Sequence, residues 1–303
     1  MKIIISGGSG LVGSHLIPKL LQRGHSIVNL TTKRTIRETY DPKFMESYWS
    51  PKEAKIDHII FDKADAVINL AGFSVSNRWT KENRTRMIDS RIDSTGLLVS
   101  AILDNQVPIQ TFVSASASGF YSSSDVTQSE EEIKGTGFLP DLTADWENAS
   151  TSLSHNGIRR VIFRIGVVLA AEDGALVKML PFFKLGLGSA VGSGKQWMSW
   201  IHIEDLCEMF VFAVESKNLT GTYNAATPYP VSNKDFSALL AQTLKRPFIL
   251  PKVPAFALKL AFGEMSSLLL ESRKLSSKKI ENAGYRFVYP ELSGALKQLL
   301  TQK

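Results

Sequence analysis

The sequence predicts an α/β protein whose core is a doubly wound parallel sheet, with a smaller C-terminal substrate lobe interleaved with it. Three observations point to this fold: a glycine-rich turn between an apolar strand and a helix near the N-terminus, a repeated alternation of apolar runs with helical segments, and a length of 303 residues. That length exceeds one average domain, and a sheet domain that carries a second lobe accommodates it.

The first thirty residues predict a βαβ unit. Residues 2–6 are typical of a buried parallel strand, residues 11–23 of a helix, and residues 27–30 of a second strand. The turn from strand to helix needs positive φ, close approach to a pyrophosphate and tight helix packing, and glycine permits each. A plain tight turn is the alternative, but the placement favours dinucleotide binding. The predicted contacts in the turn are Gly7, Ser9, Gly10, Leu11, Val12 and Gly13, with glycines in the spacing G-x-x-G-x-x-G.

The segment after the second strand indicates which dinucleotide binds. An NAD-preferring site usually has an Asp or Glu about twenty residues beyond the glycines. This stretch reads Thr31, Thr32, Lys33 and Arg34, and no carboxylate appears before Glu38. Two cations and two hydroxyls suit a 2′-phosphate, so NADP(H) is predicted and NAD(H) is the less favoured cofactor. A solvated basic loop is the alternative reading.

The following segments continue the alternation. Strands are predicted over residues 64–70, 110–114 and 160–169, and helices over residues 81–104 and 141–155. Ligands of a doubly wound sheet lie at the carboxyl ends of its strands, where small side chains leave room for a flat nicotinamide. The predicted cofactor contacts from these strands are Leu70, Ala71, Gly72, Ser114 and Val168.

The second lobe is predicted from the order of the later elements. Residues 1–170 form the Rossmann domain, and residues 200–226 return to it as a helix over 200–215 and a strand over 221–225. Residues 171–199 and 227–303 then form the substrate lobe. In and beside this lobe, a cleft for a flat anionic ligand is predicted from Lys178, Lys184, Lys195, Trp197, Trp200 and His202.

The alternative for that cleft is a packed aromatic cluster. His202 precedes a predicted helix start, which favours a structural hydrogen bond over base catalysis. Five scattered histidines show no metal-binding spacing, so no metal is predicted.

Several motifs resemble an extended short-chain dehydrogenase/reductase of the nucleotide-sugar epimerase type, namely the glycine turn, Asn69-Leu70-Ala71-Gly72 and the segment from Ser116 to Tyr121. A closer resemblance is to the atypical epimerase-like subfamily with a characteristic C-terminal domain. Its motifs are Arg78-Trp79-Thr80, Ser90-Arg91, Trp146-Glu147, the segments from Arg164 to Leu169 and from Gly194 to Asp205, and Gly263-Glu264-Met265. The resemblance extends from residue 3 to about residue 297. The resemblance implies that Arg91 contacts the cofactor or closes the cofactor cleft. It does not identify a substrate.

The resemblance also exposes a departure. Active members of the superfamily use a Ser or Thr followed by a Tyr and a Lys spaced Y-x-x-x-K, in which the Lys lowers the pKa of the Tyr. Here Trp146 and Ser150 stand at those two positions. The single literal Y-x-x-x-K, from Tyr48 to Lys52, contains a proline that disfavours a helix, so we regard it as coincidental. Lowering a tyrosine pKa from 10 to 7 is worth about 4 kcal/mol, which is lost without the lysine.

Two catalytic candidates remain. Ser116 matches the superfamily serine and could orient a substrate oxygen, while a small residue that allows close cofactor approach is the alternative. Tyr121 could donate a hydrogen bond to a carbonyl, and aromatic packing is its alternative.

Composition excludes several protein classes. The formal charge of +6, from 35 basic and 29 acidic residues spread along the chain, favours an anionic small ligand over nucleic acid. One cysteine, Cys207, forms no internal disulfide and suits a reducing cytoplasm. The apolar run after Met1 is too short for a signal peptide. Residues 253–270 are interrupted by Lys259 and Glu264, so an amphipathic helix is predicted there and no membrane span. A monomer and a homodimer both stay open.

Two functions follow. The first is an NADP(H)-dependent oxidoreductase or epimerase that works by hydride transfer. The second is a non-catalytic NADP(H)-binding sensor or regulatory protein, which the missing Tyr and Lys would permit. The enzyme is favoured because the predicted cleft has no purpose without a second ligand.

Overall fold

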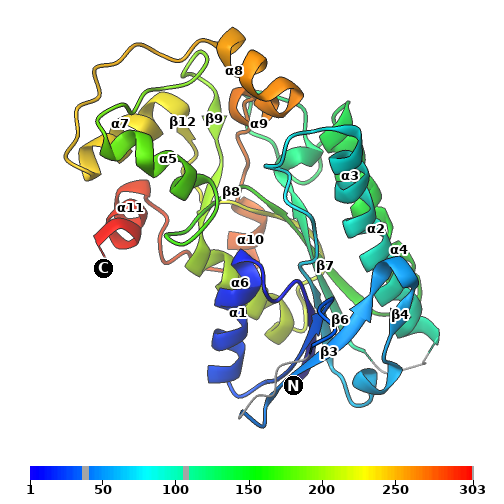
Figure 1. The fold of residues 1–303 in the computed structure, drawn as a ribbon. Coiled ribbons are helices and arrows are strands. Elements are labelled where there is room, and N and C mark those ends of the chain that lie inside the picture. Colours follow the sequence, from blue (N-terminus) through cyan, green and yellow to red (C-terminus); the bar gives the residue numbers. More distant parts are fainter. Residues whose placement is uncertain (36–40, 105–108, 302–303) are drawn as a thin grey trace.

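The computed structural model describes residues 1–35, 41–104 and 109–301. Its centre is an eight-stranded sheet with the order β11-β7-β6-β5-β1-β2-β3-β4 (Figure 1). The strands are β1 (Lys2–Ser6), β2 (Ser26–Thr31), β3 (Phe44–Ser50), β4 (Lys55–Ile56), β5 (Ala66–Asn69), β6 (Thr111–Ala117), β7 (Arg159–Ile165) and β11 (Gly221–Ala225). All neighbouring pairs are parallel except β3 with β4. The predicted doubly wound α/β fold is confirmed.

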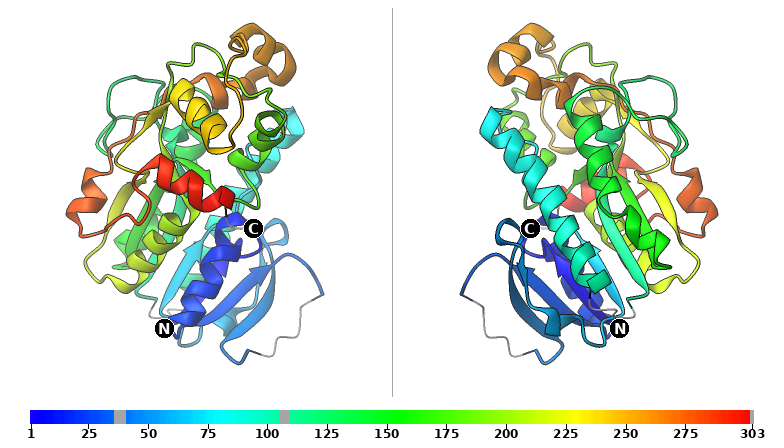
Figure 2. Two further views of the ribbon diagram at one scale, coloured as in Figure 1. Left: turned by 90° about the vertical axis from the view of Figure 1, so that its left-hand side faces the viewer. Right: turned by 90° about the vertical axis from the view of Figure 1, so that its right-hand side faces the viewer.

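Helices cover both faces of this sheet. On one face lie α1 (Leu11–Gln22) and α6 (Ile203–Glu215), and on the other lie α2 (Lys81–Asp104), α3 (Phe138–Asn148) and α4 (Thr151–His155), which face the viewer in the right-hand view of Figure 2. Because side chains alternate along a strand, Ile3 and Ile5 pack into the core beneath α1 and α6, while Ile4 packs into the core beneath α2. A strand with both faces buried needs this continuous apolar run.

Two predicted elements are each broken in two. The strand predicted over residues 160–169 is interrupted at Gly166, after which β8 (Val167–Leu169) leaves the large sheet and pairs with β10 (Trp200–His202). A Cβ on Gly166 would lie 2.5 Å from the carbonyl oxygen of Ser199, so only glycine fits there. The helix predicted over 141–155 is two helices, α3 and α4, with a break at residues 149–150. Near this break, Arg160 donates to the carbonyl of Glu147 at 2.7 Å.

One further prediction needs correction. The helix predicted over 200–215 begins only at Ile203, because Trp200 to His202 form β10.

The structure also contains a strand that was not predicted. This strand, β3, lies next to β2 in the sheet, on the side away from β1. It contains Tyr48, while Lys52 lies in the 3₁₀ turn Pro51–Glu53, so the literal Y-x-x-x-K is not on a helix.

We call residues 171–199 and 227–301 the second lobe. It contains α5 (Ala175–Lys184), an antiparallel pair of β9 (Trp197–Met198) with β12 (Val231–Ser232), α7 (Asn233–Thr243), α8 (Ala255–Phe262), α9 (Ser267–Leu270), α10 (Lys278–Asn282) and α11 (Leu292–Thr301). The amphipathic helix predicted over 253–270 is two helices, because a 3₁₀ turn over Gly263–Ser266 starts with Gly263 at φ +59°. No helix in the described ranges is long and apolar enough to cross a membrane.

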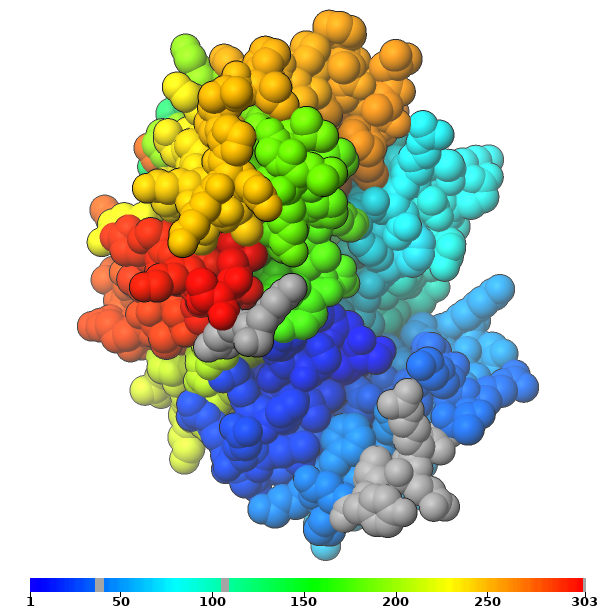
Figure 3. Space-filling view, turned by 60° about the vertical axis from the view of Figure 1, so that its left-hand side comes forward, coloured from blue at the N-terminus to red at the C-terminus, as the bar shows by residue number. Residues whose placement is uncertain are grey.

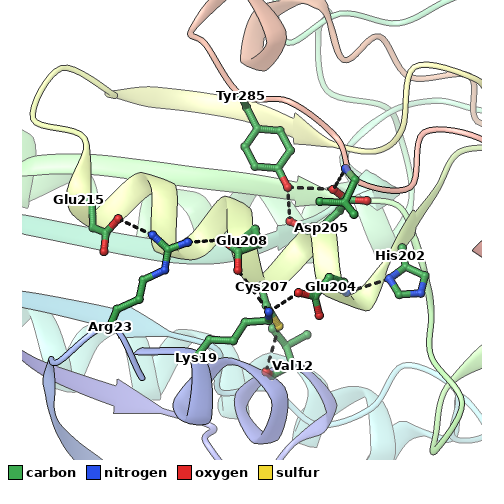
Figure 4. A network of polar contacts seen from close by, with 11 residues as sticks. Val12, Lys19, Arg23, His202, Glu204, Asp205, Cys207, Glu208, Glu215 and Tyr285 are labelled. Carbon is green, nitrogen blue, oxygen red and sulfur yellow. Dashed lines mark hydrogen bonds and ion pairs between the residues drawn. The ribbon is translucent and has the colours of Figure 1, made fainter. Parts of the chain in front are cut away.

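The second lobe is tied to the first by residues of α6 (Figure 4). The buried carboxylate of Asp205 accepts hydrogen bonds from the backbone N–H groups of Val288 (2.7 Å) and Tyr289 (2.8 Å) and from the hydroxyl of Tyr285 (3.0 Å). A buried carboxylate with three donors anchors the segment before α11 to α6. Figure 3 shows segments of the second lobe (green and red) packed against the N-terminal segment (blue). Glu172 of the second lobe lies 3.4 Å from the imidazole of His15 in α1.

A second set of contacts in Figure 4 joins α1 to α6. Lys19 pairs with Glu204 and Glu208, and Arg23 donates to Glu208 at 2.7 Å and to Glu215 at 3.0 Å. The thiol of Cys207 is buried between these helices and faces the carbonyl of Val12 at 3.7 Å. These contacts fix the helix that follows the glycine turn.

Candidate functional site

The glycine turn lies where the strand order reverses, between β1 and β5. Gly7 has φ +74°, and a Cβ there would lie 2.7 Å from the backbone of Leu70 at the end of β5. A Cβ on Gly13 would lie 2.4 Å from the Cα of Gly8. The strand ends and the first turn of α1 therefore meet with no room for side chains, which is the arrangement that admits a pyrophosphate close to the backbone.

The N-terminus of α1 suits an anion. Its N-cap is Gly10, which provides no side-chain cap, and the first turn contains no acidic residue. The free N–H groups and the positive end of the helix dipole are left for a ligand. Ser9 and Gly10 are exposed, whereas Leu11 and Val12 are half-buried. The turn thus fits the pyrophosphate of the predicted cofactor.

The end of β2 presents the residues that favour NADP(H). Thr31 is half-buried and its hydroxyl accepts a hydrogen bond from the N–H of Lys33 at 3.2 Å. Thr32, Lys33 and Arg34 are exposed, and the guanidinium of Arg34 approaches Glu53 only to 3.9 Å. Both cations are therefore available to a phosphate. Glu38 lies outside the described residues.

The strand ends of β5 and β6 are held by a buried hydroxyl network. Ser6 donates to Asn69 at 2.6 Å, and Asn69 donates to Thr95 at 2.8 Å. The predicted contact Ser114 belongs to this network: it is 3% exposed, and its hydroxyl donates to the carbonyl of Ala115. The cofactor contact of Ser114 stays a prediction. Leu70, Ala71 and Val168 are half-buried.

Arg91 of α2 lies beside Gly72, and its predicted contact with the cofactor stays a prediction. Its Nη1 donates to the carbonyls of Phe73 (3.0 Å) and Met87 (3.1 Å), and a Cβ on Gly72 would lie 3.2 Å from its Cζ. The guanidinium lies 4.9 Å from the ring centre of Trp146. Burial lowers the pKa of Arg91 to about 10, which leaves it charged at neutral pH.

Trp146 has an unpaired donor. The residue is 6% exposed, and its indole Nε1 is buried without a hydrogen-bond partner in the described part of the chain. A buried unpaired N–H costs free energy unless a ligand or water accepts it. Gly72, Arg91 and Trp146 are therefore brought together at the edge where the nicotinamide half is expected.

Ser116 and Tyr121 belong to one ion-pair network. The hydroxyl of Ser116 donates to the carboxylate of Glu147 at 2.6 Å. Arg164 binds both oxygens of Glu147 at 2.9 Å and donates to the hydroxyl of Tyr121 at 3.1 Å. That hydroxyl in turn donates to Asn224 at 2.7 Å. The sequence marked Glu147 of α3 only as part of the Trp146-Glu147 motif, and the structure brings its carboxylate directly to Ser116.

Tyr121 is fully buried, and burial raises its pKa to about 12. Its hydroxyl already has a donor and an acceptor, Arg164 and Asn224. A phenol in this state stays protonated at neutral pH and has no free hydrogen for a substrate. The packing alternative describes Tyr121 better than the catalytic one.

The cleft predicted from the later tryptophans is corrected. Trp200 is fully buried and its indole donates to the carbonyl of Tyr229, while His202 is 1% exposed and lies between Gln298 and the N–H of Glu204. The expected structural hydrogen bond of His202 is present. Trp197 is half-buried beneath the ammonium of Lys274 at 4.2 Å, and Lys195 is exposed. Trp200 and His202 therefore do not line a cleft, and the part of the prediction that rests on Lys178, Lys184, Lys195 and Trp197 stays a prediction.

A cavity of about 270 Å³ lies instead between the first lobe and the α9 region. It is lined by Trp79, Tyr121, Ser122, Ser123, Thr136, Gly137, Phe138, Leu139, Pro140, Ser267, Glu271 and Arg273. The sequence analysis named the motifs that contain Trp79 and Glu264 but predicted no role for them. These motifs are the sequence features that could have pointed to this cavity. Another cavity, of about 470 Å³, is lined by residues of β3 and β4 together with Ala54 and Asp57, and none of its lining residues belongs to the second lobe.

The segment around the Arg78-Trp79-Thr80 motif and the segment around the Gly263-Glu264-Met265 motif are in contact beside the cavity. Glu264 forms an ion pair with Arg84, and Arg78 donates to the carbonyl of Ala261 at 3.0 Å. Arg84 also lies 4.7 Å from the ring centre of Phe138. Residues from α2 and from the turn after α8 thus hold the two lobes together at this point.

Comparison with known proteins agrees with this geometry. Residues 3–226 match the model of the NAD dependent epimerase/dehydratase family, and residues 253–299 match a domain of unknown function, DUF1731. The chain is 35% identical to epimerase family protein YfhF of Bacillus subtilis, over 100% of this chain and 99% of that protein. It is 33% identical to epimerase family protein SA0724 of Staphylococcus aureus, over 99% of each.

Solved structures show the same fold. The human epimerase family protein SDR39U1 (isoform 2), crystallised with NADPH, matches with a TM-score of 0.89 and 29% identity over 100% of both chains. MoeE5 in complex with UDP-glucuronic acid and NAD matches with a TM-score of 0.78 and 17% identity, over 98% of this chain and 96% of that one, and shows the fold alone.

Proposed function

Because this chain belongs to the NAD-dependent epimerase/dehydratase family, we propose that it is an NADP(H)-dependent oxidoreductase or epimerase acting on a small-molecule substrate. One observation carries the proposal: a continuous series of contacts leads from the glycine turn to α3. Gly7 meets Leu70, and Gly72, two residues further on, meets Arg91, which stacks on Trp146. This series follows the carboxyl edge of the sheet, where a doubly wound fold binds a dinucleotide.

The phosphorylated cofactor is favoured by charge. Lys33 and Arg34 are exposed after β2, and no carboxylate of the described residues takes the position of the ribose-binding acid. The NADPH in the human SDR39U1 structure supports the same choice. When bound, NADP(H) supplies or accepts a hydride, and the protein must then handle a proton.

We assign that proton to Ser116 and Glu147. Ser116 already donates to Glu147, so a substrate hydroxyl that passes its proton to Ser116 would send the serine proton on to the carboxylate. Arg164 fixes the carboxylate through two hydrogen bonds, and Tyr121 supports Arg164. Glu147 would thus take over the role for which active superfamily members use Tyr and Lys.

A non-catalytic NADP(H)-binding protein is the second candidate. The observation that favours it is that the carboxylate of Glu147 is already occupied: it accepts two hydrogen bonds from Arg164 and one from Ser116. The cavity between the lobes favours the enzyme, because a sensor of the cofactor alone needs no second binding site.

The proposal is tested by titrating the purified protein with NADPH and NADH, followed by cofactor fluorescence and thermal unfolding. A ligand present at 100 times its Kd stabilises the folded state by about 2.7 kcal/mol. We expect saturable binding of NADPH with a clear rise in Tm and a weaker effect of NADH. The absence of both signals at millimolar NADPH would contradict the proposal.

A further inference from the structure

Exposed apolar side chains gather in two segments of the second lobe, residues 174–190 and 244–263. Of the eighteen large apolar residues that are exposed in the described ranges, eight lie in these two segments, which make up 37 of the 303 residues. An apolar patch of this kind marks a contact site for a membrane, a protein or a ligand. The most exposed of the eight are Phe182, Leu185, Ile249, Phe256 and Leu260, with Ile249 at 83% and Leu260 at 85%.

The two segments lie side by side. A Cβ on Gly186, just after α5, would lie 3.5 Å from the Cγ of Pro247. The hydroxyl of Ser189 donates to the carbonyl of Pro251 at 2.6 Å, and α8 begins four residues further on. Figure 3 shows these parts of the chain (green, gold and orange) next to one another on one surface. We call the exposed side chains of the two segments the basic apolar face.

The charges of the basic apolar face all have one sign. Its two segments contain six basic residues, all exposed, and no acidic residue. The chain has 35 basic and 29 acidic residues, so without these six the two signs balance at 29 each. The formal charge of +6 therefore comes from this face, and the rest of the chain is formally neutral. The six residues are Lys178, Lys184, Lys245, Arg246, Lys252 and Lys259.

Helix α8 shows how the two kinds of side chain are combined. Leu258 is its buried residue, whereas Phe256, Lys259 and Leu260 are exposed. Large apolar side chains on the solvent side of a surface helix are unfavourable in water, because such a helix normally turns its apolar stripe toward the core. Helices that lie in the plane of a membrane interface combine Phe and Leu with Lys in this way.

The composition and shape of the face favour a bilayer over other anionic partners. A nucleic acid would use the cations but leave Leu and Ile side chains without a role, since bases stack on aromatic rings. Protein interfaces hold their central side chains in shaped pockets, and none of the eight apolar residues lines either of the cavities described above. A second copy would bring two sets of six positive charges together. A bilayer needs no matching shape, because its interface takes up protruding side chains of any arrangement.

We propose that the basic apolar face docks on a membrane surface that contains anionic lipid. The protruding apolar side chains enter the interface, and the six cations contact the phosphate headgroups. The protein lies on the bilayer and does not cross it, so the prediction of no membrane span stands as it is. The inference goes beyond the proposed function, because the glycine turn, Ser116 and Glu147 all lie outside this face.

The test is sedimentation of the full-length protein with sucrose-loaded vesicles. Vesicles of equal parts phosphatidylcholine and phosphatidylglycerol are compared with vesicles of phosphatidylcholine alone. We expect the anionic vesicles to bind roughly tenfold or more tightly, since each Lys or Arg beside an anionic surface contributes roughly fivefold. Raising the NaCl concentration from about 0.05 to 0.5 M should weaken this binding, because salt screens the charges.

Two variants separate the apolar contribution from the charges. Phe256→Ser combined with Leu260→Ser should weaken binding roughly tenfold or more at every salt concentration. Lys184→Gln, Arg246→Gln and Lys259→Gln together should reduce the preference for anionic vesicles roughly tenfold or more. The matched controls replace exposed residues outside the face and should bind like the parent protein: Val126→Ser with Ile133→Ser, and Lys52→Gln with Lys81→Gln and Lys297→Gln.

The folding of each variant is checked by urea unfolding. If the parent protein does not bind anionic vesicles at low salt, the proposal is wrong. Binding that survives Phe256→Ser with Leu260→Ser would also overturn it, because a surface that uses its charges alone holds any polyanion. A dimer in sedimentation velocity that becomes a monomer in the serine variant would show that a second copy covers the face. NADPH binding is measured separately, so the proposed function and this inference can fail independently.

Discussion

The indole of Trp146 stacks on the guanidinium of Arg91, with 4.9 Å between the ring centre and the Cζ atom, and its N–H has no acceptor among the described residues. The resemblance predicts that Trp146 stands at the position where active superfamily members have their tyrosine. A non-titrating donor beside a buried cation can hold an electronegative atom of a ligand, but it cannot exchange a proton at neutral pH. Binding and proton transfer are thus assigned to different residues in this protein.

Replacing Arg91 with Ala should weaken NADPH binding roughly tenfold or more, because the stacking and the contact beside Gly72 are both lost. Fluorescence titration measures the effect. Lys81→Ala, an exposed charge on the same helix, is the matched control. Unchanged NADPH affinity in a folded Arg91→Ala protein would assign Arg91 to structure alone.

The double replacement of Lys33 and Arg34 with Ala should weaken NADPH by roughly ten- to a hundredfold and leave NADH nearly unchanged. A charge-assisted contact to the 2′-phosphate is worth about 1.5 to 3 kcal/mol, and NADH lacks that phosphate. The ratio of the two dissociation constants is the quantity to measure. Equal losses for both cofactors would point to a general effect on the β2 end instead.

Tyr121→Phe should retain NADPH binding and lose about 1 to 3 kcal/mol of unfolding free energy, because Arg164 and Asn224 each lose a buried partner. Urea unfolding measures the change. If the variant binds NADPH and is as stable as the parent but has lost turnover with an identified substrate, Tyr121 is the catalytic residue after all.

The same tyrosine gives a pH signature. Burial raises its pKa to about 12 in the folded protein, above the ordinary value near 10 of the unfolded chain. Its contribution to stability is therefore complete below pH 10 and lost as the pH rises to about 12. Stability measured between these two pH values should fall less steeply in Tyr121→Phe than in the parent protein. Parallel curves would show that Tyr121 does not titrate in this way.

Asp205→Asn should destabilise the protein by about 2 to 4 kcal/mol. The two carboxylate oxygens now accept hydrogen bonds from three donors, and an amide NH₂ in place of one oxygen would face a donor and accept no hydrogen bond. Burial raises the pKa of Asp205, so its donors must compensate the cost of the buried charge. Urea unfolding of this variant is compared with that of Asp62→Asn, an exposed aspartate. A loss no greater than that of the control would show that the anchor between α6 and the segment before α11 contributes little.

The sequence by itself determined the parts of the fold that depend on local pattern. The glycine spacing predicted β1, the turn and α1, and helical periodicity predicted α2 with its observed bounds, Lys81–Asp104. These features repeat within a few residues, so neighbours in the chain suffice to define them. The same locality made the missing Tyr and Lys visible, since both belong to one helix.

Only the tertiary structure decided which side chains share a site. Trp200 and His202 lie in a motif that suggested a cleft, yet both are buried, because β10 pairs with β8 inside the protein. Arg273, which the sequence did not mark, reaches the same cavity as Trp79 because Ser272 bonds to the first lobe. Such contacts join residues far apart in the chain, and their geometry depends on how the lobes pack, which no periodicity in one sequence records.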